Sequence, residues 1–112
     1  MSAILLQPSA AAGFVSFFGH LAKGASDTVD LPEGMVNIGG NSKGYMLAAQ
    51  DNWDPTANSD GTADALALGD DIYLYAVQPG TGAYADVVAS KNSTVPTGYN
   101  ASNSRKIGGF HY

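Results

Sequence analysis

The stretch from Val87 to Tyr112 reads VVASKNSTVPTGYNASNSRKIGGFHY and predicts two β-strands joined by a turn and a polar loop. Its first residues, Val87–Ala89, are of types that favour strands. Pro96 fixes φ at what we expect to be the second position of a turn, and Gly98 relaxes the backbone two residues later. Arg105–Tyr112 returns to branched and aromatic residues, which predicts a second strand.

A glycine pair, Gly108–Gly109, stands in the middle of this second predicted strand. Glycine inside a strand usually marks a bulge or the close approach of another backbone or ring. No residue of the stretch belongs to a recognisable catalytic arrangement, so we expect its role to be structural.

The stretch resembles a segment of the tail-fibre and tropism-determinant proteins of tailed bacteriophages and their prophages. In that family a strand ending in Ser-Lys-Asn-like residues leads to Pro-x-Gly-Tyr, a short loop, Arg-x-Ile-Gly and often Gly-Phe-His. The matching positions here are Ser90, Lys91, Asn92, Pro96, Gly98, Tyr99, Arg105, Ile107, Gly108, Gly109, Phe110 and His111. The resemblance extends more loosely to Leu68–Tyr75, and we recognise nothing specific in residues 1–67.

This resemblance carries several expectations. In the family the segment lies upstream of a receptor-binding region, and the fibres are trimers. It therefore implies a virion protein, assembled in the host cytoplasm, that contacts copies of itself and other tail or baseplate proteins. The host receptor would be reached only through a distal domain that follows residues 25–112.

The segment Asp71–Gln78 is the clearest strand outside this stretch. Its two faces alternate between Ile72, Leu74, Ala76 and Tyr73, Tyr75, Val77. Because both faces are apolar or aromatic, we expect a central strand, or one whose second face is covered by a neighbouring subunit. A turn at residues 79–82 then predicts a hairpin with Tyr84–Ser90.

A second hairpin is predicted between Thr28–Leu31 and Met35–Ile38, which both alternate. We expect Pro32-Glu33-Gly34 to join them, with Gly34 in a bulge. Residues 39–44 predict another loop, and Tyr45–Gln50 a further strand. These short strands predict an all-β fold, a small sandwich or prism of antiparallel strands intertwined in an oligomer.

The apolar segment of residues 1–24 is ambiguous. It lacks the charge pattern of a secretory signal, and Pro8 and polar residues break any membrane span. A helix from Ser9 to Lys23 and a buried strand at Gly13–Phe18 both fit, and we favour the strand. We expect this segment to be an anchor or interface, together with part of the strand Asp71–Gln78. The interface residues that we predict are Phe14, Val15, Phe17, Phe18, Leu21, Tyr73 and Tyr75.

Composition limits the possible functions. At 112 residues the chain is one domain with a single core, and it has no cysteine to form disulfides or thiolate metal sites. Charged residues make up 13% of the chain, about half the usual share, and the net charge is −5. With few basic side chains, a nucleic-acid partner is not expected. Few charges and many small residues favour a surface covered by neighbours in an assembly.

Candidate sites for chemistry are weak. The acidic segment Asp51–Asp64 predicts a surface loop, and its oxygen ligands at Asp54, Asn58, Asp60 and Asp64 do not fit an EF-hand frame. Asx-turns explain the same residues. His20 and His111 lack a recognisable nucleophile partner. A set of aromatic residues could line a sugar-binding face but fits packing in the core or a subunit interface better: Tyr73, Tyr75, Tyr84, Tyr99, Phe110 and Tyr112. We therefore predict no catalytic, cofactor or metal site.

The sequence thus predicts the base of a phage tail fibre, which attaches the fibre to the tail tip or baseplate and leads to a distal receptor-binding domain. Three other functions remain open. One is a host receptor- or glycan-binding module that uses the loop around Trp53. The others are a capsid or tail decoration protein and a polysaccharide depolymerase, which would need paired carboxylates in a cleft.

Overall fold

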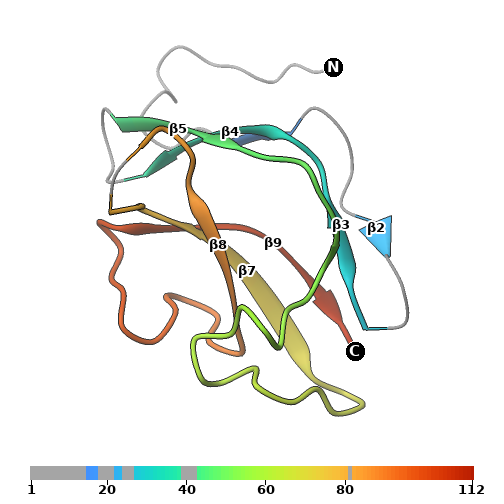
Figure 1. Cartoon of the computed structure of the whole chain (residues 1–112). Helices are drawn as coiled ribbons and strands as arrows, with labels where there is room; N and C mark the ends of the chain where they lie inside the picture. Colours follow the sequence, from blue (N-terminus) through green and yellow to red (C-terminus); the bar gives the residue numbers. More distant parts are fainter. Residues whose placement is uncertain (1–14, 18–21, 24–26, 39–42, 81) are drawn as a thin grey trace.

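The computed structural model describes residues 15–17, 22–23, 27–38, 43–80 and 82–112 (Figure 1). Every regular element within these ranges is a β-strand, which confirms the all-β prediction. The strands are β1 Val15–Phe17, β2 Ala22–Lys23, β3 Val29–Leu31, β4 Gly34–Ile38, β5 Lys43–Leu47, β6 Gln50–Trp53, β7 Asp71–Val77, β8 Asp86–Ser90 and β9 Ser104–His111.

Strands β3 to β6 form one long, bent hairpin, which we call the bent ribbon. β3 pairs with β6 and β4 pairs with β5, so that Leu31 lies opposite Gln50 and Gly34 opposite Leu47. The pairing is interrupted at Pro32, which has no N–H to give to a strand ladder. β1 and β2 pair with β4 and β3 along the other edge of the ribbon.

The predicted hairpin at Pro32-Glu33-Gly34 is therefore wrong. These residues carry the chain from one three-stranded sheet to the next, and Gly34 is a paired residue of β4. The predicted strand Tyr45–Gln50 is likewise divided between β5 and β6. The alternation itself is confirmed, because Val29, Leu31, Val36 and Ile38 are all buried.

The third sheet has the order β8-β7-β9 and lies across the ribbon as a second layer (Figure 1). β7 is the central strand, as predicted, and the hairpin with β8 places Val77 opposite Asp86 and Tyr73 opposite Ser90. The two layers also meet at one side, where Met46 N donates to Ala83 O (2.8 Å) and Ala85 N donates to Met46 O (2.9 Å). The arrangement is a small β-sandwich.

The core lies between these two layers and forms one hydrophobic cluster. The ribbon contributes Val29, Leu31, Val36, Ile38, Tyr45, Leu47 and Trp53, and the third sheet contributes Ile72, Leu74, Ala76, Val87 and Ala89. At roughly 25 cal/mol per Å² of apolar surface, such burial is the main force that holds the layers together. Among the described residues, no helix is long and apolar enough to cross a membrane.

The acidic segment is more ordered than the sequence predicts. Asp51–Trp53 belongs to β6, and Ala63 is fully buried. Asp60 N donates to Ala89 O and Ala89 N donates to Asn58 O, each at 2.9 Å, so the segment covers the outer edge of β8. Trp53 is 5% exposed and packs in the core, which makes the surface-loop prediction wrong for this ring.

The N-terminal prediction is tested only in part. β1 and β2 are strands, so the strand alternative holds at residues 15–17 and the helix from Ser9 to Lys23 does not. Phe14, Phe18 and Leu21 lie outside the described residues, and only the backbone is described for Val15 and Phe17. Their assignment to an interface stays a prediction.

Candidate functional site

The Pro-x-Gly-Tyr part of the motif forms a tight turn. Tyr99 N donates to Pro96 O at 3.1 Å, and Gly98 has a φ of +88°, as expected for the third position of a type II turn. Pro96 therefore occupies the first position of the turn and not the second, which corrects the prediction. Its ring is fully buried, so the turn is packed against the domain.

We predict that Gly98→Ala lowers the free energy of unfolding by about 1 kcal/mol. Among the described residues, no atom lies within 4 Å of the position that an added Cβ would take, so the effect comes from the positive φ. Gly80→Ala is the control, because that position is equally open and its φ is ordinary. Urea unfolding measures both variants, and equal stabilities would contradict the assignment of this turn.

The loop that leads to this turn covers the outer face of β7. The Tyr75 hydroxyl donates to Asn92 O at 2.5 Å, and Tyr75 is fully buried within its own chain. Burial, with smaller contributions from Tyr73 and Asp60, raises the pKa of Tyr75 above its usual value. Tyr75 therefore has no exposed surface for a partner, whereas Tyr73, which we also assigned to an interface, is half-buried.

Removing this hydroxyl in Tyr75→Phe is expected to cost about 1 kcal/mol of stability, since Asn92 O then lacks its partner. The ring itself stays packed, so far-UV circular dichroism of the folded variant should be unchanged. Thermal unfolding would show the loss. A variant as stable as the parent would mean that water replaces the lost bond.

The glycine pair in β9 has both roles that the sequence predicts for it. Leu74 pairs with Gly108 but Tyr75 pairs with Lys106, so Ile107 is an extra residue in a bulge. Ile107 packs against the core cluster. At Gly109, an added Cβ would lie 2.7 Å from Ile72 O, so only glycine allows β9 to approach β7 this closely.

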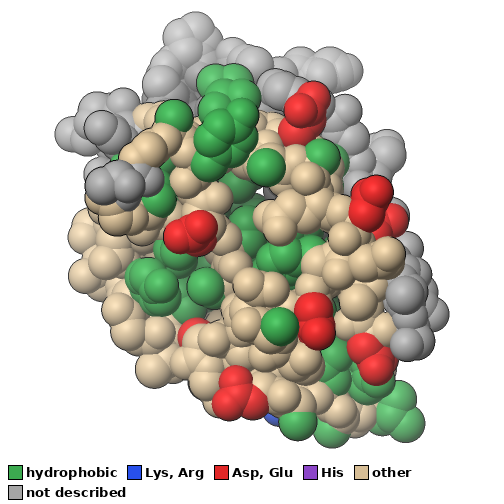
Figure 2. Space-filling model, in the orientation of Figure 1, with side chains coloured by type: hydrophobic (Ala, Val, Ile, Leu, Met, Phe, Trp, Pro, Cys, Tyr) green, Lys and Arg blue, Asp and Glu red, His purple; other side chains and the backbone are tan. Residues whose placement is uncertain are grey.

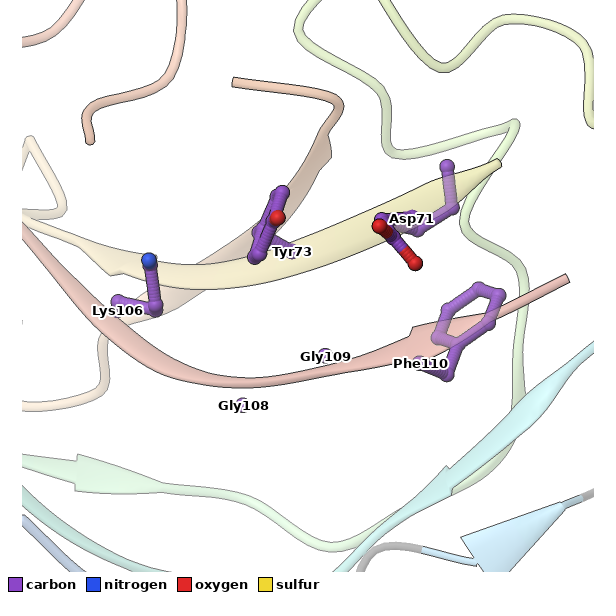
Figure 3. A pocket seen from close by; sticks show the side chains of 7 residues that line it. Asp71, Tyr73, Lys106, Gly108, Gly109 and Phe110 are labelled. Carbon is purple, nitrogen blue, oxygen red and sulfur yellow. The ribbon is translucent and has the colours of Figure 1, made fainter. Parts of the chain in front are cut away.

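A hollow of about 420 Å³ opens beside the pair on the surface of the third sheet (Figure 3). Its lining residues are Asp71, Ile72, Tyr73, Lys106, Gly108, Gly109 and Phe110. Lys106 Nζ lies 4.6 Å from the centroid of the Tyr73 ring and also donates to Ser93 O. Figure 3 shows the Tyr73 side chain between those of Lys106 and Asp71.

His111 extends the polar side of this hollow. Its Nδ1 lies 2.7 Å from Asp71 Oδ1, and both side chains are exposed. The two residues are cross-strand partners of β9 and β7. Of the remaining motif residues, Arg105 lies opposite Ala76 in the β9–β7 ladder and Phe110 packs against the core.

The acidic segment does not form a metal site among the described residues, where no group of three or more acidic or histidine side chains could hold an ion. Asp54 accepts hydrogen bonds from the backbone and hydroxyl of Thr56, which lower its pKa. Asp60 binds Thr62 in the same way. These are the Asx-turns that the sequence predicts for the segment.

The hollow is the part of this surface that sequence reasoning missed. Tyr73 was assigned to an interface, but Asp71 and Lys106 were not singled out. A signal was present in the motif, because a glycine pair inside a strand indicates a place where side chains leave a gap. Which residues of β7 lie beside the glycine pair depends on how β7 pairs with β9, and the sequence does not show this pairing.

Fold and motif together define a small β-sandwich domain whose motif residues set turns, a bulge and a close strand approach. Residues 20–112 match the family model of the Mtd second domain, so the chain belongs to that family. This confirms the resemblance to tropism-determinant proteins of bacteriophages. The chain is also 42% identical over 57 residues to a tail fiber receptor-binding protein of Bordetella phage BPP-1.

That match covers 51% of this chain but 14% of the relative, so the chain spans a small part of the relative's length. No solved structure matches the chain.

Proposed function

We propose that this chain is the structural base of a phage tail fibre, located in the virion, which attaches the fibre to the tail tip or baseplate and connects it to a distal receptor-binding domain. The observation that carries the proposal is the family match over residues 20–112. The packing roles of the motif residues support the proposal. A domain that connects the tail to a distal receptor-binding domain must be rigid to hold the two in a fixed arrangement.

An apolar patch on the outside of the ribbon supports contacts within an assembly. Met35 is 39% exposed and lies opposite Met46, which in turn bridges to Tyr84, 57% exposed. On the face of the molecule that Figure 2 draws, apolar side chains stand between scattered acidic ones. Methionine-rich surfaces adapt readily to partners. We expect the oligomer to be a homotrimer, with the predicted residues Phe14, Val15, Phe17, Phe18 and Leu21 at its interface or at the baseplate.

We also propose that the chain catalyses no reaction. A depolymerase would need a carboxyl group whose pKa is raised so that it can act as an acid. The pKa values of Asp54 and Asp60 are instead lowered, that of Asp60 to about 2. We propose instead that the chain acts by burying apolar surface against its neighbours in the assembled virion.

Labelling purified virions with an antibody against this chain tests the proposal. We expect label where the fibre joins the tail in negative-stain images, and a native mass of three chains for the purified protein. Label on the capsid would favour a decoration protein, and label at the fibre tip would favour direct receptor contact. Either result would contradict the proposed attachment role.

A further inference from the structure

The hollow on the surface of β7 and β9 brings together an aromatic ring, a cation and a carboxylate. None of these three side chains belongs to the hydrophobic core cluster. Tyr73 is half-buried, and Lys106 and Asp71 are exposed. The volume of about 420 Å³ lies in the range of small-molecule sites. Lys106 also bonds to Ser93 O and Asp71 also pairs with His111, and all three side chains line the hollow together.

The charges around the hollow favour a neutral ligand. The Lys106 ammonium can only donate hydrogen bonds and the ionised Asp71 carboxylate can only accept them, whereas the Tyr73 hydroxyl can do both. Because the opposite charges of Lys106 and Asp71 offset each other, neither an anion nor a cation gains a net electrostatic attraction from this pair. Several hydroxyl groups on one neutral molecule would satisfy all three side chains.

Bonding capacity is available at each of these groups. Lys106 Nζ has three hydrogens and gives one to Ser93 O. His111 holds Asp71 through Oδ1, and within the described residues no hydrogen bond uses Asp71 Oδ2 or the Tyr73 hydroxyl. The pairing with His111 fixes the carboxylate beside the hollow.

The ring completes the site. Lys106 Nζ lies 4.6 Å from the centroid of the Tyr73 ring. The cross-strand partner of Tyr73 is Gly109, which has no side chain to cover the ring. The C–H face of a sugar ring packs on an aromatic ring of this kind. We propose that the hollow binds a neutral saccharide, which packs against Tyr73 and hydrogen-bonds to Asp71 and Lys106. This site goes beyond the proposed attachment role and does not depend on it.

Saturation-transfer NMR with the full chain tests the site. The probes are free glucose, galactose, mannose, rhamnose and N-acetylglucosamine, each at about 10 mM, with glucuronic acid and glucosamine as charged controls. We expect at least one neutral sugar to receive saturation and both charged controls to receive less. No transfer to any neutral sugar would overturn the proposal.

Variants assign the binding to the hollow. We expect Tyr73→Ala to weaken binding about tenfold, and Asp71→Asn and Lys106→Met about threefold each. Tyr84→Ala is the matched control, since this exposed tyrosine lies outside the hollow, and its binding should be unchanged. If Tyr73→Ala does not fold, the binding of Asp71→Asn and Lys106→Met, both at exposed residues, decides whether the sugar binds in the hollow.

Two results would overturn the site. One is equal loss of binding in Tyr84→Ala and in the hollow variants. The other is a change, with protein concentration and without sugar, in the NMR chemical shifts of the residues that line the hollow. Such a change would show that the hollow is a contact between copies of the chain.

Discussion

Replacing Gly109 by alanine is expected to lower the free energy of unfolding by about 2–3 kcal/mol. The added Cβ would lie 2.7 Å from Ile72 O, closer than such atoms approach in real structures. That oxygen belongs to the backbone of β7, which is hydrogen-bonded to strands on both sides. The clash can therefore be relieved only by moving β9 and disturbing its ladder.

Gly44→Ala is the matched control for this variant. Gly44 also lies in a strand, but no atom of the described residues lies within 4 Å of its added Cβ and its φ is ordinary. We expect its stability to change by no more than about 0.5 kcal/mol. Urea unfolding at neutral pH measures both, and a Gly109→Ala protein as stable as Gly44→Ala would show that β9 can shift without cost.

The sequence was sufficient for the features that local pattern determines. The alternation of Ile72 and Leu74 with Tyr73 and Tyr75 predicted a central strand, and of these four residues all but the half-buried Tyr73 are buried. The hairpin with β8 and the close approach at the glycine pair also followed from short-range patterns. The resemblance carried by the motif led to the correct family.

Features that depend on long-range pairing were not predictable in this way. Pro32-Glu33-Gly34 fits a hairpin turn by composition, but the two strands beside it pair with partners further along the chain. Trp53 stands in a polar segment, and only the fold shows that its ring enters the core. The hollow depends on the β7–β9 register, which the bulge at Ile107 shifts by one residue.

Asp60→Ala is expected to cost about 2–3 kcal/mol of stability at neutral pH, because it leaves several donors without an acceptor. Asp60 Oδ1 accepts from the backbone and hydroxyl of Thr62, and Oδ2 accepts from Thr97 N at 2.6 Å. The last bond ties the acidic segment to the motif turn itself, because Thr97 is the second residue of that turn. The carboxylate thus holds together segments that are far apart in sequence.

Asp54→Ala provides a matched control for Asp60→Ala. Asp54 makes the same turn with Thr56 two residues on, but it is exposed, and within the described part of the chain its carboxylate bonds to no distant segment. We expect a clearly smaller loss of stability, measured by urea unfolding at neutral pH. Equal losses would mean that the turn, and not the link to Thr97, is what Asp60 contributes.

The pH dependence of stability gives a second measurement of the same link. Partial burial of Asp60 opposes ionisation, but hydrogen bonds from Ser90, Thr62 and Thr97 outweigh it and lower the pKa from 3.8 to about 2. A lowered pKa stabilises the fold above pH 3.8, and this contribution is lost as the pH falls through about 2. With allowance for solvent screening, it amounts to about 1–2 kcal/mol. The difference in unfolding free energy between the parent and Asp60→Ala should therefore shrink as the pH falls from 4 toward 2. A difference that stays constant over this range would show that the charge of Asp60 does not stabilise the link.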